Sequence, residues 1–230
     1  MVAVSSALVE HFREIDAWVF DLDNTLYPAG TSLGRQINEG IRGVVARHFG
    51  VDVADAAQIQ RALRDAHGTT LRGMMTEHGI EPETFLAFEA QMDYSVLTPD
   101  PLLTEAIRAL PGRRLIFTNG SRAHAERVLS RVGMDGLFDD VFDILAGELV
   151  PKPMPEAYDR FVAELGVRPE HAAMFEDLAV NLDVPRKLGM TTVLVGSASA
   201  PVADVIDEIG GHDYATDDLA GFLRSIVTTE

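Results

Sequence analysis

The fold is decided by the stretch Ala17-Trp18-Val19-Phe20-Asp21-Leu22-Asp23-Asn24-Thr25, an apolar run that stops abruptly at two aspartates. Four consecutive apolar residues predict a short strand that is buried on both faces, as in the middle of a parallel sheet. Three further apolar runs end in a similar way. They are residues 115–117 before Thr118-Asn119, residues 172–175 before Glu176-Asp177, and residues 191–195 before Gly196.

Helical patterns lie between these runs. Residues 121–131 form one, with Ser121 as its cap, and residues 155–165 form another, with Pro155 in the first turn. A third pattern covers residues 182–188 and stops before Gly189. Alternation of strand and helix predicts an α/β fold, a doubly wound and mainly parallel sheet with helices on both faces.

One region breaks this alternation, because residues 34–97 contain only helical patterns. We expect four helices there, at residues 35–49, 55–66, 70–78 and 82–92, the first three closed by Gly50, Gly68 and Gly79. Such an insertion after the first strand predicts a helical cap domain over residues 31–97. The α/β core domain would then comprise residues 1–30 and 98–230.

Composition narrows the chemistry. The 230 residues include no cysteine, which excludes disulfides, thiolate zinc sites and cysteine nucleophiles. The net charge of −17 disfavours nucleic acid polymers and anionic membranes as partners, since both are bound through Lys and Arg. Residues 1–16 lack a basic start followed by an apolar run, and no apolar stretch is long enough to cross a bilayer. We therefore expect a cytoplasmic protein with a small-molecule partner.

The polar residues that follow the strands would meet in one crevice, because open parallel sheets bind ligands beyond the carboxyl ends of their strands. Lys152 would join them from a loop that Pro151 and Pro153 stiffen. Asp21 and Asp23 would face opposite sides of an extended chain, but Pro28 and Gly30 suggest an irregular turn that brings both to the crevice. The expected members are Asp21, Asp23, Thr118, Asn119, Lys152, Glu176 and Asp177.

Several carboxylates so close together repel one another, and a divalent cation removes the conflict. Ligands that are all oxygen favour a hard ion such as Mg²⁺. Together with Lys152, that ion would make an acidic protein locally attractive to a phosphate dianion, and Thr118 would donate a further hydrogen bond. One aspartate could then attack phosphorus, while the second protonates the leaving oxygen and later activates water.

In order and spacing, Asp21-Leu22-Asp23-Asn24-Thr25, Thr118-Asn119, Lys152 and Glu176-Asp177 resemble the motifs of the haloacid dehalogenase superfamily. The resemblance implies that Asp21 is the nucleophile and Asp23 the general acid–base. It implies phosphate binding by Thr118, Asn119 and Lys152. Asp21, the main-chain carbonyl of Asp23, and Asp177 would hold Mg²⁺, with Glu176 as an additional acidic group. The helical insertion would correspond to the first type of cap in that superfamily.

Within the superfamily, residues 21–28, 68–73 and 93–97 are similar to the pyrimidine 5′-nucleotidase group, although residues 90–92 depart from it. This similarity implies a phosphomonoesterase that forms an aspartyl-phosphate and hydrolyses nucleoside 5′-monophosphates. Phosphatases of phosphoglycolate or sugar phosphates, and a phosphomutase, remain open alternatives. Asp23 argues against a dehalogenase. A second aspartate serves to protonate an alkoxide leaving group, and a dehalogenase reaction has no such leaving group. Retention of Asp21, Asp23, Lys152 and Asp177 argues against a catalytically inactive binding protein.

The other acidic, histidine and methionine residues are interpreted without a functional role. We expect Asp135, Asp139, Asp140 and Asp143 to form a solvated loop and strand entry. His48, His67 and His78 lie near predicted helix ends without partners at a metal spacing, and Met74 and Met75 suit packing within the cap.

Overall fold

A computed structural model describes residues 6–196 and 212–227 of the chain. Its sheet contains six parallel strands in the order β3-β2-β1-β4-β5-β6, which confirms the predicted α/β class. Parts of the predicted core domain and of the amino-terminal stretch (residues 1–5, 197–211 and 228–230) lie outside the described residues. The strands are β1 (Ala17–Phe20), β2 (Arg113–Phe117), β3 (Asp140–Phe142), β4 (Ala172–Glu176), β5 (Thr191–Val195) and β6 (Tyr214–Thr216).

The central strand β1 is buried on both faces, as its apolar run predicts. Trp18 and Phe20 pack on one face, where the rings of Phe20 and Phe175 lie 4.7 Å apart. Ala17 and Val19 pack on the other face. The first face is covered by α1 (Ser6–Phe12), α6 (Pro101–Arg108), α7 (Arg122–Val132) and α10 (Leu219–Ile226), and the second by α8 (Pro155–Leu165) and α9 (Asp183–Leu188).

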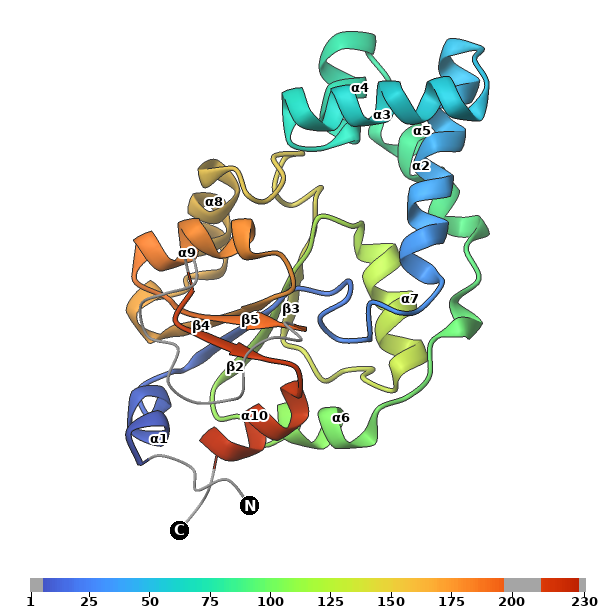
Figure 1. The fold of residues 1–230 in the computed structure, drawn as a ribbon. Helices are drawn as coiled ribbons and strands as arrows, with labels where there is room; N and C mark the ends of the chain where they lie inside the picture. Colours follow the sequence, from blue (N-terminus) through green and yellow to red (C-terminus); the bar gives the residue numbers. More distant parts are fainter. Residues whose placement is uncertain (1–5, 197–211, 228–230) are drawn as a thin grey trace.

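The helices inserted after β1 gather beyond the end of the sheet, at the top of Figure 1. They share a hydrophobic cluster of their own, in which Met74 is fully buried and Met75 partly so, as expected for packing residues. Ile144, which follows β3, also belongs to this cluster. The segments are α2 (Leu33–Phe49), α3 (Val53–His67), α4 (Thr70–His78), α5 (Pro82–Leu86) and the 3₁₀ turns η1 (Ala87–Gln91) and η2 (Tyr94–Val96).

Local signals explain most of these boundaries. The Asp52 side chain caps α3 by accepting hydrogen bonds from the N–H groups of Ala54 and Asp55. The left-handed backbone of Gly50 ends α2, and that of Gly79 ends α4. The helix predicted over residues 82–92 instead ends at Leu86 and continues as the 3₁₀ turn η1.

The acidic stretch from Asp135 to Asp143 corrects one prediction. Asp143 is buried rather than solvated, because its carboxylate accepts hydrogen bonds from the main-chain N–H groups of Arg122 and Ala146. Those bonds fix the start of α7 beside the end of β3. Asp140 begins β3, so the expectation of a strand entry there is confirmed.

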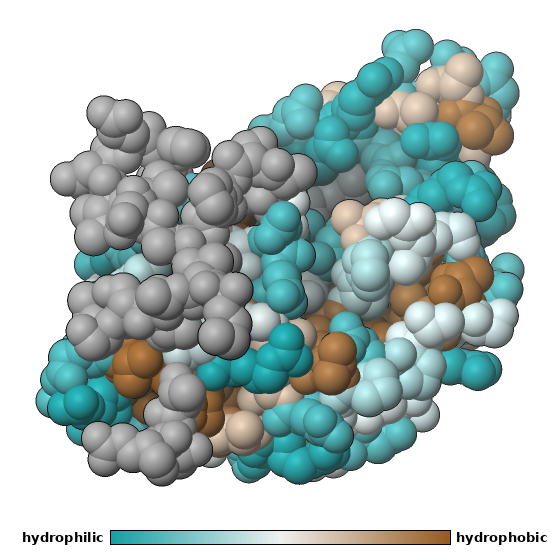
Figure 2. Space-filling view, turned by 60° about the horizontal axis from the view of Figure 1, so that its bottom comes forward, coloured by the Kyte–Doolittle hydropathy of each residue, from teal (hydrophilic) through white to brown (hydrophobic). Residues whose placement is uncertain are grey.

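The surface is mainly hydrophilic on the face shown in Figure 2, where hydrophobic residues show in small separate groups. The inserted helices, at the upper right of that view, carry mostly hydrophilic residues. Among the described helices, none combines the length and the apolar character that a membrane crossing requires.

Candidate active site

Asp21 lies directly after β1, and its main-chain N–H donates to the carbonyl of Phe175 on β4 at 2.9 Å. The chain turns at once, because Asn24 takes a positive φ of 65° and the N–H of Leu26 donates to the carbonyl of Leu22. The irregular turn therefore comes earlier than Pro28 and Gly30, the residues from which a turn was predicted. The Thr25 hydroxyl, inside this turn, donates to Asp21 Oδ2 at 3.2 Å.

Lys152 is the buried cation of the site. Its ammonium group donates to Asp21 Oδ1 at 2.7 Å, to Glu176 Oε1 at 2.8 Å and to the carbonyl of Phe117 at 2.8 Å. Burial alone would lower the pKa of Lys152, but the carboxylates of Asp21 and Glu176 outweigh burial and raise it above its ordinary value. The lysine is therefore charged, and all three of its N–H bonds have partners.

The loop that carries Lys152 is held by Asn119. The Asn119 side chain donates to the carbonyl of Lys152 at 3.0 Å and accepts from its N–H at 2.8 Å. This pair of bonds fixes the loop to the end of β2, so the Asn119 amide is already engaged. The Thr118 side chain is buried beside it, and its oxygen accepts from the N–H of Gly120 at 3.0 Å. The Thr118 hydroxyl proton is therefore left to donate toward a ligand.

Glu176 and Asp177 follow β4 and differ in their surroundings. Glu176 is 1% exposed, and both of its oxygens have donors, namely Lys152 and the Asn181 amide on Oε1 and the N–H of Leu178 on Oε2. Asp177 is less enclosed and accepts from the Asn24 amide at 3.3 Å. Burial and the adjacent charge of Glu176 raise the pKa of Asp177 to about 6.

Carboxylate oxygens of Asp21, Glu176 and Asp177 all lie within 4.8 Å of one another. Burial raises the pKa of Asp21 well above its ordinary value; Lys152 opposes this rise and the nearby charge of Glu176 adds to it, so the three carboxylates repel one another when all are ionised. Three oxygen donors under such repulsion fit a hard divalent cation. In the part of the chain that the structure describes, no histidine belongs to a group of this kind.

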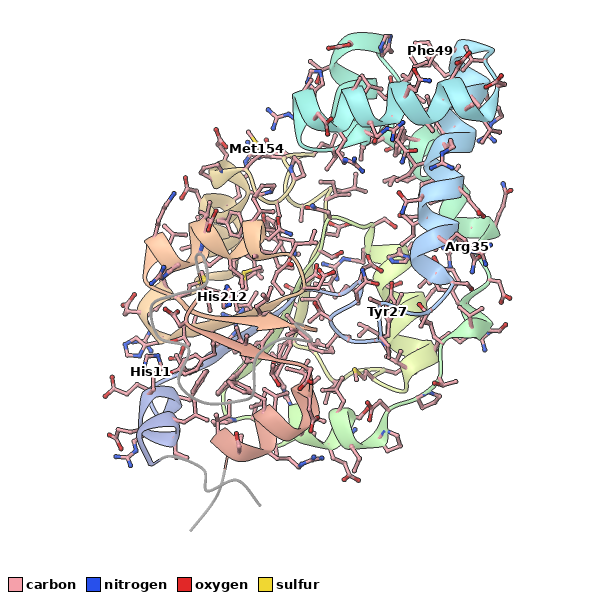
Figure 3. All side chains as sticks on the ribbon, viewed as in Figure 1. His11, Tyr27, Arg35, Phe49, Met154 and His212 are labelled. Carbon is pink, nitrogen blue, oxygen red and sulfur yellow. The ribbon has the colours of Figure 1, made fainter. Side chains whose placement is uncertain are left out.

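Asp23 lies on the other side of the turn from Asp21. Its Oδ1 accepts hydrogen bonds from the Tyr27 hydroxyl at 2.5 Å and from His124 Nε2 at 2.8 Å. Burial would raise the pKa of Asp23, but the charge and hydrogen bond of His124, together with Tyr27, hold it below its ordinary value. Tyr27 lies on the loop beside α7, as Figure 3 shows.

His124 and Tyr27 were not predicted as site residues. His124 occupies the first turn of α7, three residues after its cap Ser121, at the edge where β2 ends. A histidine in the first turn of a helix that starts at the ligand-binding edge was the available signal. Tyr27 carried a weaker signal, because a tyrosine four residues after an aspartate is common in turns and in cores.

A cavity of about 200 Å³ opens beside Asp23, between the sheet edge and the inserted helices. Asp23, Asn119 and His124 line it from the sheet side. Residues 69–71, at the start of α4 and inside the segment 68–73 that resembles the nucleotidase group, line it from the inserted helices. Much of the wall is apolar, and Glu89 places a carboxylate among the apolar residues. The apolar residues include Ile37, Ile41, Leu71, Phe85, Phe88 and Ile144.

A family model for haloacid dehalogenase-like hydrolases matches residues 15–189, which is more than half of the chain. The chain belongs to this family. Among curated relatives, it is 24% identical over 193 residues to phosphate metabolism protein 8 of Saccharomyces cerevisiae, an alignment that covers 76% of this chain and 60% of that protein. It is 26% identical over 200 residues to a glyceraldehyde 3-phosphate phosphatase of Methanopyrus kandleri, covering 79% of this chain and 84% of that one.

Solved structures share the fold of this haloacid dehalogenase-like hydrolase. A phosphatase of the family from Thermococcus onnurineus superposes with a TM-score of 0.61 at 20% identity, covering 93% of this chain and 98% of that one. The L-2-haloacid dehalogenase of Xanthobacter autotrophicus superposes with a TM-score of 0.56 at 19% identity, covering 91% and 97%. The same fold thus occurs in a protein named as a phosphatase and in one named as a dehalogenase, so the fold alone does not decide between these activities.

Proposed function

We propose that this protein is a magnesium-dependent phosphomonoesterase in which Asp21 is the nucleophile. The observation that carries the proposal is the buried Asp21–Lys152 pair at 2.7 Å, with Asp177 nearby and Asp23 two residues along the chain. The relative named glyceraldehyde 3-phosphate phosphatase, at 26% identity, supports a phosphorylated substrate. Asp23 supports an oxygen leaving group, because a halide would need no proton.

The reaction has two steps. A carboxylate oxygen of Asp21 attacks phosphorus and forms an aspartyl-phosphate, while the bond from phosphorus to the ester oxygen breaks and Asp23 protonates that oxygen. A water then attacks the phosphorus of the aspartyl-phosphate and gives a proton to Asp23. The bond from phosphorus to the Asp21 oxygen breaks, so phosphate is released and the Asp21 carboxylate is restored. In both steps Thr118 donates to a phosphoryl oxygen, and Lys152 binds another once one of its N–H bonds turns from its present partner to the phosphoryl group. Asn119 assists by fixing the Lys152 loop.

The metal would be held by Asp21, Asp177 and the main-chain carbonyl of Asp23. Bound Mg²⁺ supplies positive charge that stabilises the phosphoryl dianion and the ionised form of Asp21. Glu176 contributes indirectly in this proposal. Both of its oxygens already serve Lys152, Asn181 and Leu178, so it holds the lysine in place beside Asp21.

We propose that residues 31–97 act as a cap domain on a core formed by residues 1–30 and 98–230. The cavity lies between the two, so a substrate reaches Asp21 when the cap moves away, and closure excludes water during phosphoryl transfer. Gly68 supports a close approach of the two parts, because a Cβ there would lie 3.6 Å from Pro151 and 3.9 Å from the sulfur of Met154. Met154 lies below the inserted helices in Figure 3.

The substrate that we propose is a nucleoside 5′-monophosphate with a pyrimidine base. Apolar walls with a few polar groups, here Thr69, Thr70 and Glu89, suit a flat ring with polar edges. The volume of about 200 Å³ lies below the roughly 300–1,000 Å³ of a typical ligand pocket. That size favours a base of one ring over a base of two.

A small sugar or triose phosphate is the second candidate, because the same small volume suits it and one relative is named for glyceraldehyde 3-phosphate. Phosphoglycolate is less favoured by Glu89, whose carboxylate would face the negative charge of glycolate. A phosphomutase would use the same two aspartates and is distinguished by its product.

A panel of phosphomonoesters, assayed for phosphate release with Mg²⁺ and again after chelation, tests this proposal. We expect the highest kcat/KM with UMP, CMP or dTMP, lower values with AMP and phosphoglycolate, and loss of turnover after chelation. Highest turnover with a triose phosphate would replace the nucleotide by the second candidate. Turnover that survives chelation would contradict the metal, and isomerisation without phosphate release would indicate a mutase.

A further inference from the structure

We infer that His124 is a positioning residue that decides which oxygen of Asp23 meets the leaving group, and that Tyr94 orients His124 from the segment joining the inserted helices to the sheet. The inference rests on the proposed role of Asp23 as general acid–base. His124 and Tyr94 both lie outside the motif residues, and through them the orientation of the Asp23 carboxylate depends on the position of the insertion.

The first step concerns the two oxygens of Asp23. Within the described residues, the side-chain hydrogen bonds to this carboxylate fall on Oδ1, from Tyr27 at 2.5 Å and from His124 at 2.8 Å. Two donors occupy the lone pairs of that oxygen, so a proton in transit is carried by the other oxygen. The Asp23 side chain lines the cavity, which places Oδ2 as the oxygen available to the leaving group.

The second step concerns the protons on His124. Its Nδ1 lies 2.9 Å from the Tyr94 hydroxyl, and that hydroxyl lies 3.3 Å from the carbonyl of Glu89. If Tyr94 donates to Nδ1, the neutral ring carries its proton on Nε2. If Nδ1 donates to Tyr94 instead, the Tyr94 proton goes to the Glu89 carbonyl, and Nε2 must also carry a proton because the ionised Asp23 carboxylate can only accept. Nε2 donates to Asp23 in both arrangements.

The third step concerns how firmly the ring is held. His124 is 2% exposed, and its main-chain N–H donates to the Ser121 hydroxyl oxygen at 3.1 Å. A Cβ at Gly120 would lie 3.0 Å from the ring carbon Cδ2 of His124, so the ring fills the space beside the chain. With little freedom to rotate, the ring transmits the position of Tyr94 to Asp23.

The fourth step connects this arrangement to the cavity. Tyr94 lies on η2 and Glu89 on η1, both between the last inserted helix and α6. The Ser121 hydroxyl donates to the Glu89 carboxylate, which itself lines the cavity. The segment that borders the substrate thus also holds His124, and therefore Asp23. A displaced segment would withdraw the Tyr94 hydroxyl and leave Asp23 free to turn.

Leaving groups of different basicity test the inference. An alkyl phosphate needs its leaving oxygen protonated, whereas p-nitrophenolate leaves without a proton, so misplacing Asp23 harms the first far more. We would measure kcat/KM, which reports the steps through cleavage of the ester bond, for UMP and p-nitrophenyl phosphate. The variants are His124→Leu, His124→Gln, whose amide can still donate, and Tyr94→Phe. Asp23→Asn sets the upper limit of the difference between the two esters in their loss of kcat/KM. Tyr214→Phe on β6 is the matched control.

For His124→Leu we expect kcat/KM with UMP to fall about 100-fold, the lower end of acid–base effects, and with p-nitrophenyl phosphate to fall only a few-fold. His124→Gln should recover part of the difference, and Tyr94→Phe should show a smaller difference of the same sign. Equal losses with both esters, or no loss with either, would overturn the inference. If His124→Leu fails to fold, Tyr94→Phe and His124→Gln decide in its place. A wild-type protein inactive on both esters would overturn the proposed function instead.

Discussion

Two parts of the molecule that meet near the cavity differ in what holds them together. The floor lies at the carboxyl edge of the sheet beside the cavity; most of its groups are charged and buried, and hydrogen bonds from Lys152 join Asp21 to Glu176. The cavity roof comes from the inserted helices and is mainly apolar. The floor comprises Asp21, Thr118, Lys152, Glu176 and Asp177, and the roof comprises Ile37, Ile41, Leu71, Phe85 and Phe88.

From this difference we propose a division of roles, in which the floor carries the chemistry and the roof selects the substrate. A change in the floor leaves a buried charge without its partner, so it should harm stability and every substrate alike. A change in the roof alters shape and apolar contact, so it should redistribute activity among substrates.

Removing the buried cation should have the largest effect. Lys152→Met leaves Asp21 and Glu176 without their ion-pair partner, and we expect a loss of about 3–5 kcal/mol in the free energy of unfolding. Phosphate release should be lost with all substrates. The chain has only one other lysine, the exposed Lys187 on α9, so Lys187→Met is a matched control that should change neither property. Urea unfolding and the substrate panel measure both, and a stable, active Lys152→Met would contradict the division.

The sequence predicts the floor better than it predicts the groups around it. The residues of β1 are buried on both faces, so the strand shows as an unbroken apolar run, and parallel strands must bring Asp21, Thr118 and Glu176 to one edge. His124 and Tyr27 were missed because only the folded structure brings them together at Asp23. A separation of 101 residues lies between Asp23 and His124 in the sequence.

Short elements were also beyond the sequence pattern. The edge strands β3 and β6 have three residues each, too few to show a period. Asp143 was assigned to solvent because an acidic run usually is solvated, but here two main-chain N–H groups satisfy it in the interior. Glycine signals for helix ends did better, since Gly50 and Gly79 act locally and need no tertiary contact.

Enlarging the roof should have an intermediate effect. Ile41→Ala opens space in the cavity wall, and we expect the ratio of kcat/KM for AMP to that for UMP to rise about tenfold, within the roughly 1–3 kcal/mol of pocket contacts. Ile59→Ala is the control, because Ile59 packs in the same hydrophobic cluster but does not line the cavity. It should lower stability and leave the ratio unchanged. An unchanged ratio in Ile41→Ala would remove substrate choice from the roof.

Neutralising Glu89 should have the smallest effect, and it concerns pH. Burial raises the pKa of Glu89 despite the opposing hydrogen bond from Ser121. Because its pKa is raised in the folded state, the protonated form of Glu89 stabilises the fold relative to the ionised form. This contribution to the free energy of unfolding is fully present below the unfolded pKa of about 4.3 and is lost as pH rises through the folded pKa. Glu89→Gln should therefore melt above the wild type at pH 7.

That difference in Tm should shrink as pH falls toward the unfolded value. Thermal unfolding between pH 4 and pH 7.5 measures it, with Glu164→Gln at an exposed position on α8 as the control. A Tm difference that is independent of pH, or one of opposite sign at pH 7, would contradict the assignment of a burial penalty to Glu89.

Trapping the phosphoryl group on Asp21 tests most directly whether this aspartate is the nucleophile. Wild-type protein with Mg²⁺ and ³²P-labelled substrate is quenched in acid during the first turnover, and the labelled peptide is identified by mass spectrometry. We predict label on the peptide that contains Asp21, discharge of that label by hydroxylamine as for an acyl phosphate, and no label in Asp21→Asn. Phosphate release at the wild-type rate from Asp21→Asn, or label that persists in this variant, would contradict the role of Asp21 as the nucleophile.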